Sequence, residues 1–135
     1  MQYRNGYKNQ LYNKPEVFQL KYIFPEKDII THLGTITTKG VMTIFSWYAW
    51  DGASGPTVDT KNVVRGSCGH DFLYELIRLG FLPFRYWELA DKELNNWLKE
   101  NGTSAFRRWY WMKGLALAAG SAANPRNQKE VYTAP

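Results

Sequence analysis

The chain has 135 residues, 44% of them hydrophobic, 16% aromatic and 21% charged, which suits one domain with one modest core. Its single cysteine, Cys68, excludes an internal disulfide framework. The net charge of +5 permits weak attraction to phosphates or anionic membranes, but the basic residues are scattered and predict no specific nucleic-acid partner. No secretory signal and no apolar run of bilayer length are visible, so we expect a soluble protein made in a cytoplasm.

The first half of the sequence predicts strands. Residues 1–16 are polar with interspersed tyrosines and show no clear period, so we interpret them as an extended arm that packs by its rings, or as a frayed terminus. Residues 17–24 alternate β-branched or aromatic residues with polar ones, and residues 28–38 are rich in Ile and Thr. Residues 41–50 are similar, and all three segments are typical of strands. They indicate a small antiparallel β unit at the start of a domain that spans residues 17–120.

Three helices are expected after this β unit. A glycine-rich loop at residues 51–56 and a polar linker at 57–65 lead to the first helix, with Ser67 as its N-cap. The apolar spacing predicts helices over residues 68–79, 85–100 and 105–119. The first two are expected to form an antiparallel pair, and the tail, residues 121–135, is either disordered or extended on a neighbour. The predicted fold class is therefore α+β.

The most informative residues are a histidine, a tyrosine and an aspartate on the first two predicted helices. His70 and Tyr74 lie four residues apart and share a helix face, whereas Asp91 falls on the apolar face of the next helix. Because a bare buried carboxylate is costly, we expect Asp91 to pair with His70 and with the Tyr74 hydroxyl. A carboxylate that binds one imidazole nitrogen leaves the other free to take a proton. The same residues would alternatively form a buried hydrogen-bond network without chemistry.

Asp71 lies about 100° round the helix from His70 and remains available to a cation. The loop at residues 51–56 would offer carbonyl oxygens, which are ligands suited to Ca²⁺. The alternative is structural, since an aspartate near a helix start favours the positive end of the helix dipole. The loop would then be a plain turn between a strand and a linker.

The motif His-Asp-x-x-Tyr on one helix and Ala-Asp on the next, within residues 50–98, resembles the phospholipase A2 superfamily. The similarity is greatest to its compact viral forms, such as those of parvovirus capsid proteins. This resemblance implies a phospholipase A2-like helical core. It also implies that His70 activates a water molecule against a phospholipid ester, while Tyr74 and Asp91 orient the histidine.

The same resemblance implies a calcium site. Asp71 and carbonyl groups of the upstream loop, those of Trp50, Gly52 and Ser54, would bind Ca²⁺, which holds the phosphate and the oxyanion. Ser54 stands where the family prefers glycine, and the disulfides of the secreted members are absent.

A second resemblance covers most of residues 17–120. A β-rich start, an Asp-Gly-Ala-Ser-x-Pro loop, the His-Asp-x-x-Tyr helix, an Ala-Asp helix and a final helix that ends at Gly120 are similar to a small family of tailed-phage and prophage proteins of unknown function. This resemblance implies a phage origin and synthesis in the host cytoplasm.

From these patterns we expect a virion-associated protein of a tailed phage, a tail or baseplate accessory that packs against other phage structural proteins in a larger assembly. The alternative is a calcium-dependent, phospholipase A2-like hydrolase that acts on the host envelope, with an anionic phospholipid membrane as its partner. Residues 109–111 (Trp-Tyr-Trp) could stack on bases, but helical spacing favours core or a subunit interface. Peptidoglycan hydrolysis is less favoured, because His32 and His70 lack metal-ligand spacing.

Overall fold

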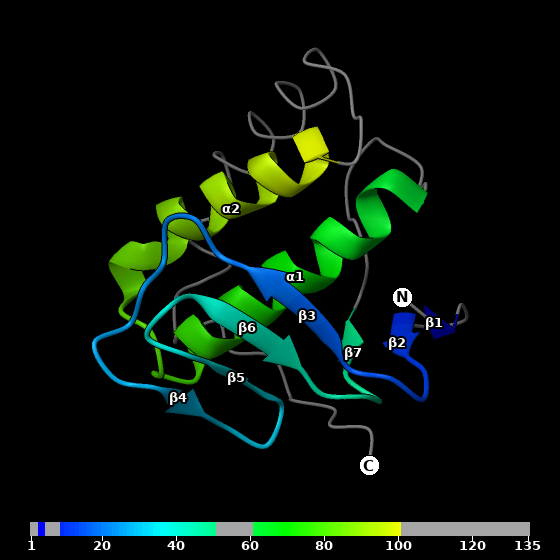
Figure 1. The fold of residues 1–135 in the computed structure, drawn as a ribbon, viewed down its shortest axis with the longest axis horizontal. Coiled ribbons are helices and arrows are strands. Elements are labelled where there is room, and N and C mark those ends of the chain that lie inside the picture. The colour runs from blue at the N-terminus through cyan, green and yellow to red at the C-terminus, as the bar shows by residue number, and fades with distance from the viewer. Residues whose placement is uncertain (1–2, 5–8, 51–60, 101–135) are drawn as a thin grey trace. The chain divides into compact units, whose positions relative to one another are not determined.

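A computed structural model describes residues 3–4, 9–50 and 61–100 of the chain (Figure 1). In this part the protein is mixed α+β, with two antiparallel sheets and two α-helices. The strands and the helices belong to two separate compact units, which we call the strand unit (described residues up to Trp50) and the helical unit (residues 61–100). The predicted domain limits at residues 17 and 120 stay predictions, and the predicted third helix and tail lie outside the described residues.

Two sheets make up the strand unit. Their orders are β1-β2-β7 and β3-β6-β5-β4, and every pair of neighbours is antiparallel. The strands are β1 Tyr3–Arg4, β2 Asn9–Leu11, β3 Glu16–Gln19, β4 Ile29–Ile30, β5 Gly34–Ile36, β6 Val41–Ile44 and β7 Ala49–Trp50. β1 and β2 lie in the segment predicted as an arm, and at two and three residues they are too short to show a period.

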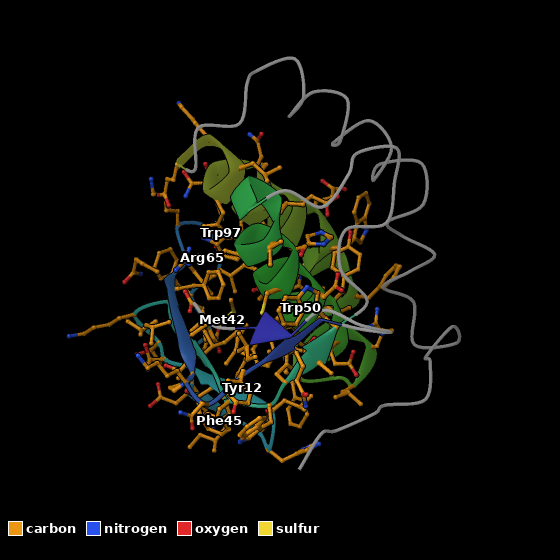
Figure 2. All side chains as sticks on the ribbon, turned by 90° about the vertical axis from the view of Figure 1, so that its right-hand side faces the viewer. Tyr12, Met42, Phe45, Trp50, Arg65 and Trp97 are labelled. Carbon is orange, nitrogen blue, oxygen red and sulfur yellow. The ribbon has the colours of Figure 1, made fainter. Side chains whose placement is uncertain are left out.

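One face of the four-stranded sheet forms its core. Phe18 lies opposite Met42 (labelled in Figure 2), and Met42 lies opposite Ile36. All three side chains are completely buried or nearly so. The next residues along the strands point to the other face, where Val17 lies opposite Thr43 and is 53% exposed. The alternation that predicted these strands therefore also sets their register.

Residues 41–50 form two strands in different sheets, so the prediction of one continuous strand was wrong. Between β6 and β7 the chain turns at Trp47, whose φ is 75°, a costly conformation for a bulky residue. Two hydrogen bonds hold it. The Trp47 N–H donates to the Leu11 carbonyl over 2.8 Å, and the Gln10 side-chain amide donates to the Trp47 carbonyl over 3.0 Å. These partners are distant in sequence, so local alternation does not reveal the turn.

The other predicted strands are shorter in the structure. β3 ends at Gln19 rather than at residue 24, and the Gln19 amide nitrogen donates to the Lys39 carbonyl over 3.0 Å as the chain leaves the sheet. Residues 28–38 were expected to form one or two strands, and they form two, β4 and β5. The turn between them is stabilised by the Thr31 hydroxyl, which donates to the Gly34 carbonyl over 2.8 Å.

The helical unit contains α1 (Lys61–Arg78), a short 3₁₀ helix η1 (Phe84–Tyr86) and α2 (Trp87–Glu100). Because α1 begins at Lys61, the prediction of a linker through Arg65 was wrong. Ser67 is not an N-cap but lies inside α1, where its hydroxyl donates to the Val64 carbonyl over 2.8 Å. None of the described helices is both long enough and apolar enough to cross a membrane.

The two helices run antiparallel, as predicted. Gly66, early in α1, packs against Leu94 and Leu98 of α2, while His70, one turn later, reaches back to Asp91. Most buried residues of α2 are those of the predicted apolar face: Ala90, Asp91, Leu94, Trp97 (labelled in Figure 2) and Leu98. Helix packing therefore fixes which residues of α1 and α2 can meet.

Close approach at Gly66 predicts a stability effect. A Cβ atom built there would lie 3.0 Å from Leu94 Cδ1 and 3.6 Å from Leu98 Cδ2, so a branched side chain has no room. We expect Gly66→Val to lower the free energy of unfolding by about 1–3 kcal/mol, as measured by urea denaturation of the full chain. Asn95→Val, at an exposed site of α2, is the control and should stay within about 0.5 kcal/mol of wild type. Equal effects of the two variants would contradict the close packing.

Candidate functional site

The structure brings together the three residues predicted to form a site. His70 Nε2 lies 2.7 Å from Asp91 Oδ1, and the Tyr74 hydroxyl donates to the same oxygen, also over 2.7 Å. All three residues are buried, with exposed fractions of 5% for His70, 6% for Asp91 and 5% for Tyr74. The carboxylate that the sequence placed on an apolar helix face therefore has two hydrogen-bond partners.

Helix geometry explains this arrangement. His70 and Tyr74 lie one turn apart on the same face of α1, and their ring centroids are 4.2 Å apart with an interplanar angle of 41°. Asp91 approaches from the first half of α2, which runs antiparallel to α1. Asp91 Oδ1 can therefore accept hydrogen bonds from His70 Nε2 and from the Tyr74 hydroxyl while both helices stay continuous.

The hydrogen-bond pattern defines the tautomer of His70. An ionised carboxylate only accepts hydrogen bonds, so the short contact with Asp91 requires the hydrogen to be on Nε2. This assignment follows from the bonding pattern. It leaves Nδ1 of the neutral ring with a lone pair, and a histidine held in this way is suited to accept a proton at Nδ1.

Tyr74 stays protonated and donates. Burial raises the pKa of the Tyr74 hydroxyl well above its ordinary value, and the negative charge of Asp91 and the hydrogen bond to it raise it further. Tyr74 therefore keeps its proton throughout the neutral range and supports the carboxylate.

The raised pKa of Tyr74 predicts a loss of stability in alkali. Above about pH 10 a tyrosine of the unfolded chain loses its proton, whereas folded Tyr74 keeps its own. The free energy of unfolding should therefore fall as pH rises, by up to about 1.4 kcal/mol per pH unit for this one group. The free energy of unfolding of Tyr74→Phe should fall less steeply than that of wild type between about pH 9 and about pH 11, as measured by denaturant titration. This range is set by the ordinary tyrosine pKa of about 10.

Tyr22→Phe is the matched control for this titration, because Tyr22 is 46% exposed. It should keep the wild-type dependence on pH. If the free energies of unfolding of wild type and Tyr74→Phe fall equally with pH, the raised pKa of Tyr74 is contradicted.

The predicted calcium ligands are described only in part. Asp71 is half-buried on α1, next to His70, and Trp50 ends β7 in the strand unit. Gly52 and Ser54 lie outside the described residues, so this site stays a prediction. Among the residues that the structure describes, no group of three or more His, Cys, Asp or Glu side chains could hold a metal ion. The predicted site is of another type, with one carboxylate and backbone carbonyls, and the Asp71 carboxylate has the hard oxygens that Ca²⁺ prefers.

No protein-family model matches the chain, and comparisons with curated proteins and with solved structures found no match.

Sequence reasoning missed one buried charged residue. Glu93 on α2 is fully buried, although it lies two positions from Asp91 and therefore about 200° round the helix from it. A glutamate off the predicted apolar face is ordinarily a solvated residue, and no signal in the sequence indicated otherwise. Cys68 is buried, as expected for a small apolar residue, and His32 is exposed on the turn between β4 and β5.

Proposed function

We propose that the protein is a phospholipase A2-like ester hydrolase, with a helical core of that type and His70 as its general base. The observation that supports this proposal is the contact of His70 Nε2 with Asp91 Oδ1 at 2.7 Å, with Tyr74 on the same oxygen. These are the partners that the phospholipase A2 resemblance implies for the base. A structural network would need the same three contacts but no access of substrate to Nδ1, so activity decides between the two.

In the proposed reaction, His70 Nδ1 takes a proton from a water molecule as the water oxygen attacks the ester carbonyl carbon. The Asp91 carboxylate stabilises the imidazolium that forms. The tetrahedral oxyanion then collapses and the bond to the glycerol oxygen breaks. The imidazolium returns its proton to that oxygen, which gives a fatty acid and a lysophospholipid.

The proposal includes a calcium ion. Ca²⁺ bound at Asp71 would supply positive charge to the phosphate and to the oxyanion. Asp71 would hold the cation, and its place directly after His70 in α1 keeps the base and this ligand in one rigid element.

The test is fatty-acid release by the full chain from mixed micelles of phosphatidylcholine and phosphatidylglycerol. We expect release with Ca²⁺ and none with EGTA, and one lysophospholipid for each fatty acid by mass spectrometry. Asp71→Asn should need more Ca²⁺ for half-maximal release, whereas Glu75→Gln, also half-buried on α1, should not. No release by wild type at any Ca²⁺ concentration would overturn the proposal and leave a structural network.

We also propose that the protein is a component of a tailed-phage particle, as a tail or baseplate accessory. The supporting observation is the exposed apolar surface of the strand unit, where Ile30 is 76%, Val17 53% and Phe24 52% exposed, since such side chains often mark contacts with partner proteins. Mass spectrometry of purified particles should detect the chain in constant proportion to the major tail proteins. Its absence from particles would contradict this role but not the enzymatic one.

A further inference from the structure

Exposed aromatic side chains occur in the connection between the two helices that carry the site. We call residues 79–86 the aromatic connection. Within it Phe81 is 46% and Phe84 43% exposed, whereas Leu82 between them is 4% exposed. Single exposed apolar residues are common, but two phenylalanines three positions apart in a short connection are a local concentration.

The backbone fixes this exposure. α1 ends in a Schellman motif, in which the Phe81 N–H donates to the Leu76 carbonyl over 2.9 Å and the Gly80 N–H donates to the Ile77 carbonyl over 3.1 Å. Gly80 has the left-handed φ of 87° that this motif needs. With Leu82 buried directly after the motif, Phe81 is held outward on a defined turn.

The second half of the aromatic connection also points to solvent. η1 contains no buried residue, and the Tyr86 N–H donates to the Pro83 carbonyl over 3.0 Å. Arg85 is exposed, with its guanidinium carbon 5.3 Å from the centre of the Tyr86 ring. Aromatic rings next to an arginine are typical of surfaces that lie at a lipid headgroup layer.

We propose that the aromatic connection docks the helical unit onto an anionic phospholipid bilayer. Phe81 and Phe84 would enter the boundary between headgroups and acyl chains, and Arg85 would meet lipid phosphates. The choice of a bilayer over a protein partner rests on the proposed function, because the same unit carries His70 and its substrate would lie in a bilayer. Arg85, exposed and next to Phe84 in the sequence, supplies the positive charge that an anionic surface attracts.

The test is co-sedimentation of the full chain with sucrose-loaded vesicles of phosphatidylcholine and phosphatidylglycerol in equal parts, in EGTA so that hydrolysis does not contribute. We expect wild type to bind, and the double variant Phe81→Ser, Phe84→Ser to partition at least about tenfold more weakly. Arg85→Glu should weaken binding to these vesicles but not to vesicles of phosphatidylcholine alone.

The matched control is Phe45→Ser, which removes an exposed phenylalanine of the strand unit and should bind as wild type does. Circular dichroism and thermal unfolding confirm that each variant is folded. Equal binding by wild type and the double variant, or no binding by wild type, would overturn the docking surface. Binding without any hydrolysis in the micelle assay would instead contradict the proposed function and leave the docking surface supported.

Discussion

Replacement of His70 by glutamine is expected to lower calcium-dependent fatty-acid release by about 10²–10⁴-fold, the usual contribution of a general base. The amide of the introduced glutamine can still donate to Asp91 Oδ1, so the carboxylate keeps a partner. The variant has no basic nitrogen in the place of Nδ1, so the attacking water keeps its proton. Initial rates on mixed micelles at saturating Ca²⁺ measure the effect, and urea denaturation shows how much stability remains.

Tyr74→Phe is the matched control for this prediction. It also removes a hydrogen bond to Asp91 Oδ1, but it leaves the base intact, so its rate should fall far less than that of His70→Gln. If His70→Gln retains wild-type activity, the base lies elsewhere in the chain. If the two variants lose activity equally and both are unstable, their shared effect is on the fold.

The contacts of the candidate site could be predicted because each depends on a simple pattern within one helix. The spacing of His70 and Tyr74 is that of one helix turn, and Asp91 interrupts an apolar helix face where a charge needs a partner. If the two helices pack antiparallel, as expected, these two facts predict that the three side chains meet. The hydrogen-bond partners of Asp91 were therefore predictable. The distances between the atoms, and which ring nitrogen of His70 faces Asp91, needed the structure.

Other features could not be predicted because packing overrides local preference. Ser67 is of a type common at helix N-caps and predicted a helix start, yet α1 continues through it, and α2 packs closely against the neighbouring Gly66. Trp47 adopts a left-handed turn that favours glycine, since hydrogen bonds to β2 hold it. In both places the deciding contact is with a residue far away in the sequence, which no local window contains.

Removal of Asp91 should have a large effect on stability. Asp91→Ala leaves the His70 Nε2–H and the Tyr74 hydroxyl buried without their common acceptor, and each unsatisfied buried group costs about 1–3 kcal/mol. We therefore expect the free energy of unfolding to fall by about 2–5 kcal/mol in urea denaturation at neutral pH. Lys92→Ala, at an exposed position next in α2, is the control and should change it by less than about 0.5 kcal/mol.

A double-mutant cycle gives the sharper form of this prediction. In a Tyr74→Phe background the hydroxyl that donates to Asp91 is already absent. The loss of unfolding free energy caused by Asp91→Ala should therefore be smaller there than in wild type, by at least about 1 kcal/mol. Strictly additive losses would show that the 2.7 Å contacts of Asp91 contribute little to the helix pair. Asp91→Asn separates stability from chemistry, because its amide oxygen still accepts from Tyr74 but its neutral side chain cannot stabilise an imidazolium. Asp91→Asn should therefore remain folded and lose most of its hydrolytic rate. If the three residues form only a structural network, the variant should lose stability and no hydrolytic rate should depend on Asp91.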